Sequence, residues 1–229
     1  MIDVDIPQLS FDGIDFGYRY FYYTYSLQSS STHSPISSSF DAAVLENYIN
    51  FGKQEPTVSS TVIRNRTEFN SIPLDVEDLW IGRFDASDMY EFLPSRFQSL
   101  KTLVIGNRLF LSVNRLELNN QNSLQILYIG DDCFGKVRVF ELDGLSELES
   151  VVIGRKSFRI SEYGEQNDGS YRIVNCPKLK SIQIGYRSFR DYNSFELSNL
   201  PSLQSIDMGS NCFYWTPSFS LTGLIDGVV

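Results

Sequence analysis

The sequence contains little of the chemistry on which most enzymes depend. It has one histidine, His33, and three cysteines, Cys133, Cys176 and Cys212, among 229 residues. A histidine-based triad would need His33 as its catalytic base, and this residue lies in a serine-rich stretch expected to be a flexible loop. Metal or nucleophilic roles for the cysteines would need histidines or paired cysteines nearby, and the three cysteines are far apart in the sequence. No phosphate-binding glycine loop or calcium loop is present. The sequence therefore predicts no catalytic residue, no metal site and no cofactor.

Long apolar runs and an export signal are also missing. No stretch approaches the 18 apolar residues of a membrane-spanning helix. Residues 1–9 carry Asp3 and Asp5 and show no basic region followed by an apolar run, which a secretory signal requires. An odd number of widely separated cysteines is typical of reduced thiols rather than of a disulfide framework. We therefore expect a cytoplasmic protein that does not insert into membranes.

An excess of positive charge is absent as well. The chain has 28 acidic and 19 basic residues, with a formal net charge of -9, which argues against binding to nucleic acid or to an anionic membrane. Apolar residues make up 42% and aromatic residues 14%, a composition typical of folded domains rather than of disordered chains. A chain of this length can bury a substantial core.

The sequence is dominated by a repeat. Six similar phrases end in glycine at intervals of 24, 24, 24, 31 and 24 residues, and each has apolar residues at its first, fourth and sixth places. The phrases are VEDLWIG, LKTLVIG, LQILYIG, LESVVIG, LKSIQIG and LQSIDMG, which end at Gly82, Gly106, Gly130, Gly154, Gly185 and Gly209.

Two further columns of apolar residues follow each phrase. A phenylalanine comes four residues after the glycine in every unit but the first, which has Ala86: the column is Phe110, Phe134, Phe158, Phe189 and Phe213. A pair of apolar residues separated by one position follows: Leu116/Leu118, Phe140/Leu142, Tyr171/Ile173, Phe195/Leu197 and Phe219/Leu221. Both the phrase and this pair alternate with the period of two that predicts a strand.

A single unit of 24 residues cannot bury its own apolar face, so the units must stack on one another about 4.8 Å apart. The phenylalanine is expected to fill the space between coils, and the glycine to relieve steric limits where the chain turns. Helices are not expected, because no unit holds a long stripe with a period of 3.6. The sequence thus predicts a mainly β fold, a curved parallel β solenoid of ~24-residue leucine-rich-like repeats with two parallel strand ladders.

These phrases resemble the leucine-rich-repeat proteins, whose units of 20–29 residues carry L-x-x-L-x-L strands. Within that family, IGRKSF at Ile153 to Phe158 and IGYRSF at Ile184 to Phe189 are similar to the bacterial surface-antigen-like repeats that are also expanded in protists. The resemblance covers Ile72 to Leu224. It implies a solenoid fold and, for the surface-antigen-like group, an extracellular adhesin.

The ends of the chain are less regular. Residues 1–75 are predicted to form an irregular repeat region with a serine-rich loop at 28–39, continuous with a solenoid at 76–229 in one domain. Residues 11–21 align with the phrase at 179–189, so we expect another coil there. Extra acidic residues at 161–169 predict a loop. Neither end shows a polar cap, which favours a longer array or end-to-end association with another copy.

Strand residues that point away from the core are the candidate binding residues. The fifth places of the first four phrases are Trp80, Val104, Tyr128 and Val152, and Ile126 lies beside Tyr128. They form a predicted apolar stripe about 14 Å long, with the residue types that anchor protein contacts. Two alternatives stay open: such residues favour strands in general, or the N-terminal segment folds over them.

The sequence thus predicts a non-enzymatic protein–protein interaction scaffold that uses the concave face of the solenoid to bind an unidentified protein partner. One alternative is the extracellular adhesin-type surface protein that the resemblance implies. A third is a β-helix polysaccharide-active enzyme, which would need acids aligned on neighbouring coils.

Overall fold

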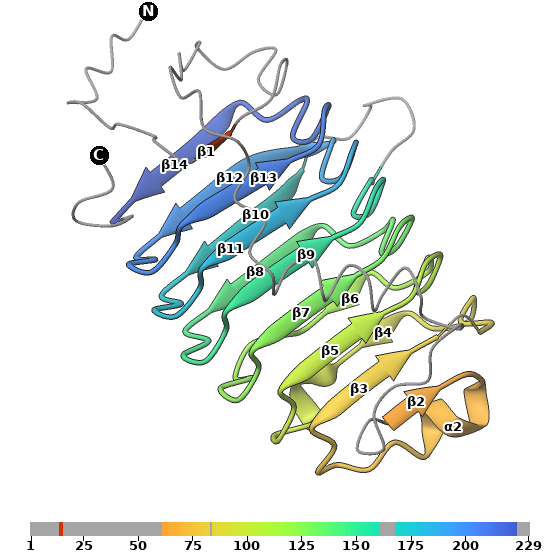
Figure 1. Cartoon of the computed structure of the whole chain (residues 1–229). Helices are drawn as coiled ribbons and strands as arrows, with labels where there is room; N and C mark the ends of the chain where they lie inside the picture. The colour runs from red at the N-terminus through yellow and green to blue at the C-terminus, as the bar shows by residue number, and fades with distance from the viewer. Residues whose placement is uncertain (1–13, 16–60, 83, 161–167, 224–229) are drawn as a thin grey trace, which may run out of the picture.

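The computed structural model describes residues 14–15, 61–82, 84–160 and 168–223. It confirms a parallel β solenoid of about six turns of roughly 24 residues. The larger ladder is an eight-stranded sheet in the order β1-β13-β11-β9-β7-β5-β3-β2 (Figure 1). Its strands are β1 (Ile14–Asp15), β2 (Thr61–Ile63), β3 (Asp78–Ile81), β5 (Thr102–Ile105), β7 (Ile126–Ile129), β9 (Ser150–Ile153), β11 (Ser181–Ile184) and β13 (Ser205–Met208).

The second ladder is formed by the later strand of each coil. Its four-stranded part has the order β14-β12-β10-β8, and the first two coils continue it as a two-stranded pair, β4 with β6. The strands are β4 (Glu91–Phe92), β6 (Arg115–Leu116), β8 (Val139–Asp143), β10 (Gly169–Val174), β12 (Tyr192–Ser198) and β14 (Ser218–Thr222). A short 3-10 turn, η1 (Pro94–Arg96), follows β4.

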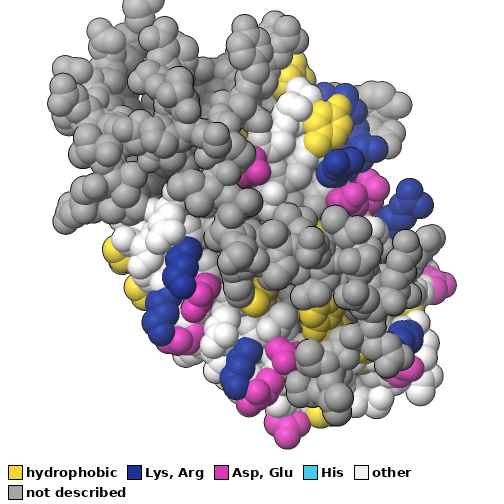
Figure 2. Space-filling model, viewed as in Figure 1, with side chains coloured by type: hydrophobic (Ala, Val, Ile, Leu, Met, Phe, Trp, Pro, Cys, Tyr) yellow, Lys and Arg dark blue, Asp and Glu magenta, His cyan; other side chains and the backbone are white. Residues whose placement is uncertain are grey.

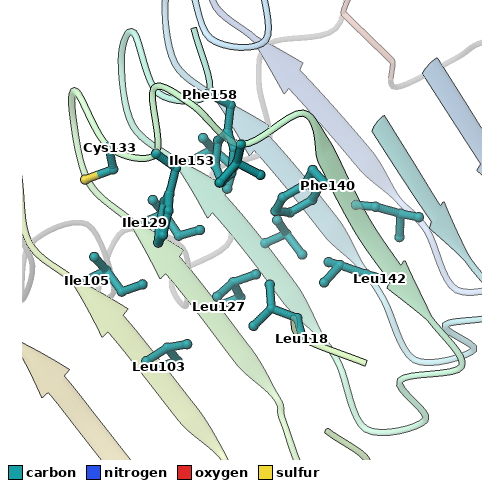
Figure 3. Packing of buried hydrophobic residues seen from close by; sticks show 14 of the residues in the cluster. Leu103, Ile105, Leu118, Leu127, Ile129, Cys133, Phe140, Leu142, Ile153 and Phe158 are labelled. Atoms are coloured by element: carbon teal, nitrogen blue, oxygen red, sulfur yellow. The ribbon is translucent and has the colours of Figure 1, made fainter. Parts of the chain in front are cut away.

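The predicted columns are confirmed by the strand register. In the eight-stranded sheet Leu79, Leu103, Leu127 and Val151 are direct cross-strand neighbours. In the second ladder Phe140, Tyr171, Phe195 and Phe219 are neighbours in the same way. The two sets face one another across a shared core, where Leu103 and Leu127 approach Leu118 and Leu142 (Figure 3).

The phenylalanine column forms a continuous stack inside the solenoid. The ring centroids of Phe134 and Phe158 are 5.2 Å apart, those of Phe158 and Phe189 are 4.7 Å apart, and those of Phe189 and Phe213 are 5.3 Å apart. These rings are nearly parallel, and Phe158 and Phe189 are fully buried. Each ring therefore contacts the equivalent ring in the coil above and in the coil below.

The glycine that ends each phrase serves a different purpose from the predicted one. No glycine of this column has a positive φ; the turn instead places two other residues per coil in the left-handed region, such as Lys156 and Phe158 at φ 56°. A Cβ on Gly154 would overlap the carbonyl carbon of Gly130 and lie 2.6 Å from the backbone nitrogen of Asp131. Glycine is needed here because the backbones of successive coils touch.

The N-terminal phrase takes the register that its alignment predicts. Ile14 pairs with Ile206 and Asp15 with Asp207, in parallel, and these partners occupy the repeat positions of Ile182 and Gln183. Strand β1 therefore adds one further strand beyond β13, at the end of the sheet opposite β2.

A short helix, α2 (Arg66–Asn70), lies between β2 and β3 and was not expected from the sequence. The Asn65 side chain accepts a hydrogen bond of 2.9 Å from the Glu68 backbone N–H, and the Glu68 carboxylate accepts one of 2.6 Å from the Arg64 N–H. This reciprocal capping stabilises a single turn without a long apolar stripe. Phe69 anchors the turn in the core. The predicted serine-rich loop and residues 161–167 of the predicted acidic loop lie outside the described residues.

Replacing the stacked Phe189 should destabilise the fold strongly. Phe189→Ala removes a ring that contacts Phe158 and Phe213, and the resulting cavity should lower the free energy of unfolding by about 3–5 kcal/mol. Urea unfolding followed by circular dichroism measures this change. The control Tyr90→Ala removes an aromatic side chain that is 63% exposed and should change stability by no more than about 0.5 kcal/mol. Equal effects of the two substitutions would contradict the stacking role.

Two glycines that lie near one another in sequence should respond differently to a methyl group. Gly154→Ala forces a backbone overlap with the preceding coil and should cost about 1–3 kcal/mol of stability. Gly135→Ala is the control, because its Cβ would meet nothing closer than the Arg159 carbonyl oxygen at 3.6 Å. Thermal unfolding of both variants tests the role of backbone contact, which is refuted if Gly135→Ala is the more damaging of the two.

Candidate functional site

The predicted binding residues lie together on the outer face of the eight-stranded sheet, the face that points away from the second ladder. Trp80 on β3 pairs with Val104 on β5, Val104 pairs with Tyr128 on β7, and Tyr128 pairs with Val152 on β9. These four side chains form a hydrophobic cluster separate from the core cluster. We call Trp80, Val104, Tyr128 and Val152 the outer column. Ile126 lies two positions before Tyr128 on the same strand and the same face.

The centre of the outer column is buried although it lies outside the core. Val104 is 1% exposed, Tyr128 4% and Val152 2%, whereas Trp80 and Ile126 are half-buried. Burial raises the pKa of the Tyr128 hydroxyl well above its usual value, so the tyrosine is neutral at physiological pH. The middle of the column is therefore apolar and shielded from solvent, whereas Trp80 and Ile126 are partly exposed.

Sequence reasoning missed three residues of this surface. Ser150 on β9 and Ser181 on β11 are buried on the same face, and the Ser181 hydroxyl lies 3.2 Å from the Ser150 hydroxyl. Val62 on β2 extends the outer column by one strand, because it pairs with Trp80. The serines gave no apolar signal, and Val62 precedes the first recognisable phrase. Beyond Val152 the same positions carry the half-buried Gln183 and the exposed Asp207, whose side chains lie 3.5 Å apart.

Charged side chains surround this face as pairs between neighbouring coils. Lys101 lies 2.7 Å from Glu77, and Lys180 lies 2.7 Å from Glu149, each just before a strand of the sheet. In Figure 2 acidic and basic side chains lie next to one another on the lower left side of the molecule. Such exposed pairs contribute little stability individually. Because opposite charges lie next to one another, this edge of the sheet carries no large area of a single charge among the described residues.

The second ladder carries a denser charge cluster on its solvent side. The Arg172 guanidinium lies 2.7 Å from Glu141, 2.9 Å from Asp143 and 3.2 Å from Glu196. Hydrogen bonds from Asn175 and Arg172 lower the pKa of Asp143. One cation thus links three successive coils through hydrogen bonds to three carboxylates. The cluster is a structural feature of the ladder rather than a site that offers unused groups to a ligand.

The cysteines lie in the turns after the strands, where their thiols face backbone carbonyls. Cys133 Sγ lies 3.1 Å from the Gly106 carbonyl oxygen, and Cys212 Sγ lies 3.0 Å from that of Gly185. In the two units between them the Ser157 hydroxyl donates to the Gly130 carbonyl and the Ser188 hydroxyl donates to the Gly154 carbonyl, each at 2.6 Å. Either serine or cysteine therefore serves as the small side chain that fills this slot. Burial raises the pKa of Cys133 and Cys212 to about 12 and that of Cys176 to about 11.

Within the described part of the chain, no group of three or more histidine, cysteine, aspartate or glutamate side chains is placed to hold a metal ion. None of the helices described there has the length and apolar character to cross a membrane. His33 lies outside the described residues. The outer column is therefore the candidate functional site.

Comparison of the chain with protein-family models, curated proteins and solved structures found no match.

The three thiols should be unreactive while the protein is folded. All three are buried and unpaired, and their raised pKa values leave almost no thiolate at pH 8, the form that attacks disulfide reagents. Titration with a chromogenic disulfide at pH 8 should detect no fast thiol in the native protein and all three after unfolding in guanidinium. Rapid native reaction of any one cysteine would contradict its place in the packed turns.

Proposed function

We propose that this protein is a non-enzymatic protein-interaction scaffold that binds a polypeptide partner on the outer face of its eight-stranded sheet. The observation that carries the proposal is the outer column: four apolar side chains, two of them aromatic, that are held in register outside the core. Tyrosine and tryptophan are enriched among the residues that dominate binding energy at protein interfaces. We also propose that the protein is cytoplasmic and that its coils belong to the leucine-rich-repeat class.

The rigidity of the sheet supports this role. Each residue of the column is fixed between two neighbouring strands, and the strands rest on a continuous core. A surface held in this way loses little conformational entropy when it binds a partner, and this loss is one of the main costs of association. Trp80 and Ile126 are half-buried and so offer an apolar surface at the flank of the buried centre.

Two acids at the ends of the outer face, Asp78 and Asp207, lie too far apart to act together in carbohydrate cleavage. On the outer face of β3 to β13, acidic side chains occur at Asp78 and Asp207, which lie on strands five steps apart in the sheet. Five strand spacings amount to about 24 Å, whereas paired carboxylates of glycosidases lie within about 10 Å of each other. These two acids cannot act on one glycosidic bond.

Substitution of Trp80 tests the proposed function. We expect full-length wild-type protein to capture a partner from a lysate of its source, and Trp80→Asp to weaken the interaction with that purified partner by about 30-fold or more, as for an aromatic anchor residue. The dissociation constant is measured by surface plasmon resonance, and unchanged circular dichroism spectra show that the variant is folded.

The matched control is Tyr90→Asp, which places the same charge at an exposed aromatic position outside the sheet. It should bind as the wild type does. The proposal fails if the wild type captures no specific partner, or if Trp80→Asp and Tyr90→Asp bind that partner equally well.

A further inference from the structure

We infer that Arg155, Lys156 and Arg187 form a binding site for an acidic polypeptide segment, one rich in aspartate and glutamate. We call these three residues the basic ridge. They lie on the turns that follow β9 and β11, at the edge where the strands of the eight-stranded sheet end. The ridge is separate from the outer column, so this site goes beyond the proposed function and does not depend on it.

The two turns of the basic ridge are held side by side by backbone contact. The Lys156 N–H donates to the Tyr186 carbonyl oxygen at 2.8 Å, and a Cβ on Gly185 would lie 2.7 Å from the backbone nitrogen of Arg155. Lys156 and Arg187 each follow the glycine of their phrase by two positions, and both have a positive φ, 56° and 61°. Because neighbouring coils lie about 4.8 Å apart, three cationic side chains leave the backbone within one small area.

The cations of the ridge differ from many others on the solenoid because they have no acidic partner. Lys178 and Lys180, for example, each lie 2.7 Å from a glutamate on the neighbouring coil. None of the ion pairs found among the described residues includes a member of the basic ridge. Arg155 and Lys156 are exposed, and Arg187 is half-buried. Their charges are therefore accessible to a ligand.

The clustering of these cations favours the binding of an anion. Like charges on neighbouring coils repel one another, and a bound acidic group relieves that repulsion. The cluster occurs on a chain whose formal net charge is -9, so it is a local exception to the overall charge. In Figure 2 several basic side chains lie close together at the upper right, the side on which the strands of this sheet end in Figure 1.

Tyr186 positions one member of the ridge. The guanidinium carbon of Arg187 lies 5.0 Å from the centroid of the Tyr186 ring, and the face of an aromatic ring attracts a cation. Tyr186 is half-buried, and its carbonyl oxygen is bonded to the neighbouring coil. The ring therefore restricts the guanidinium without neutralising its charge, and less side-chain entropy is lost when it binds a carboxylate.

The hydrogen bonds of the turns favour carboxylates over a phosphate group as the ligand. Phosphate sites commonly use backbone N–H groups as donors. Here the Lys156 N–H donates to the Tyr186 carbonyl, and the Arg187 N–H donates to the Ser210 carbonyl at 3.0 Å. The ridge therefore offers side-chain charges that are spread over two coils, and this arrangement suits several separate carboxylates better than one phosphate.

The neighbouring coils limit the length of the site. The equivalent position on the preceding coil is Asp132, which lies 3.9 Å from Arg108, and on the following coil it is the uncharged Asn211. The Asp131 carboxylate accepts a hydrogen bond of 2.6 Å from the Arg155 backbone N–H and so stays beside the ridge, where it repels anions. A long polyanion such as nucleic acid would extend over these acids, whereas a short acidic segment can remain on the two coils.

Fluorescence anisotropy with an acidic probe tests the inference. The probe is a fluorescein-labelled hexaglutamate peptide, titrated with purified full-length protein at low salt. We expect the triple variant Arg155→Gln/Lys156→Gln/Arg187→Gln to raise the dissociation constant by about tenfold or more. Because exposed charges are screened by salt, about 0.5 M sodium chloride should weaken binding to the wild type by a similar factor.

The matched control is the triple variant Arg64→Gln/Arg96→Gln/Lys180→Gln. It removes the same number of positive charges from exposed positions near α2, in η1 and before β11, and should raise the dissociation constant by no more than about twofold. The inference is overturned if the wild type does not bind the peptide, if the ridge variant binds as the wild type does, or if both variants lose binding equally.

A second probe distinguishes a peptide site from a nucleic-acid site. We expect fluorescein-labelled hexadeoxythymidylate to bind the wild-type protein more weakly than the peptide does. Binding of the oligonucleotide that is at least as tight, and that is lost in the ridge variant, would assign the ridge to nucleic acid and overturn the inference.

Thermal unfolding separates a binding role of the ridge from a structural one. Because the three cations repel one another and form no ion pair among the described residues, the ridge variant should unfold at the wild-type temperature or above it. A clear decrease in its unfolding temperature would show that the cations stabilise the fold, and would contradict their assignment to a ligand.

Discussion

The fold depends on parallel backbone hydrogen bonding between equivalent strands of successive coils. The Gly106 N–H donates to the Ile81 carbonyl at 2.8 Å, the Gly130 N–H to that of Ile105 at 2.9 Å, and the Gly154 N–H to that of Ile129 at 2.6 Å. Because each strand pairs with the equivalent strand of the next coil, equivalent side chains lie one above another. The phenylalanine stack, the slot filled by serine or cysteine, and the outer column all follow from this one register. The close approach of the backbones is also the reason for the glycine column.

The unit of 31 residues shows how the solenoid accepts a change in length. Its extra residues fall between Phe158 and β10, and both ladders keep their register on either side: Ile153 pairs with Ile184, and Phe140 with Tyr171. The adjustment at the start of β10 is a register shift between Gly169 and Ser170. An insertion in the connection between the two ladders therefore leaves the stacked strands unchanged, as loops in repeat proteins generally do.

The sequence was sufficient to predict the solenoid, because each structural position is repeated several times. Similar residues that recur at equivalent positions indicate that the units stack on one another. The repeat could not reveal features that occur once. Helix α2 depends on a local capping interaction of Asn65 with Glu68, and the close approach of the Ser150 and Ser181 hydroxyls belongs to one pair of strands. The phrase around Ile14 predicts a coil, but all coils present similar surfaces to their neighbours. Its pairing with β13 was therefore not determined by pattern alone.

Placement of β1 changes what one end of the eight-stranded sheet exposes. A parallel sheet that grows by stacking has an unpaired strand at each end, and unpaired strand edges promote association with other chains. Strand β1 pairs with the edge of β13 that would otherwise lie open. The end strand there is then β1, which has two residues, whereas β13 has four. Very short edge strands are one of the ways in which native sheets limit edge-to-edge association, so the pairing of β1 reduces the length of strand edge that this end offers to another chain.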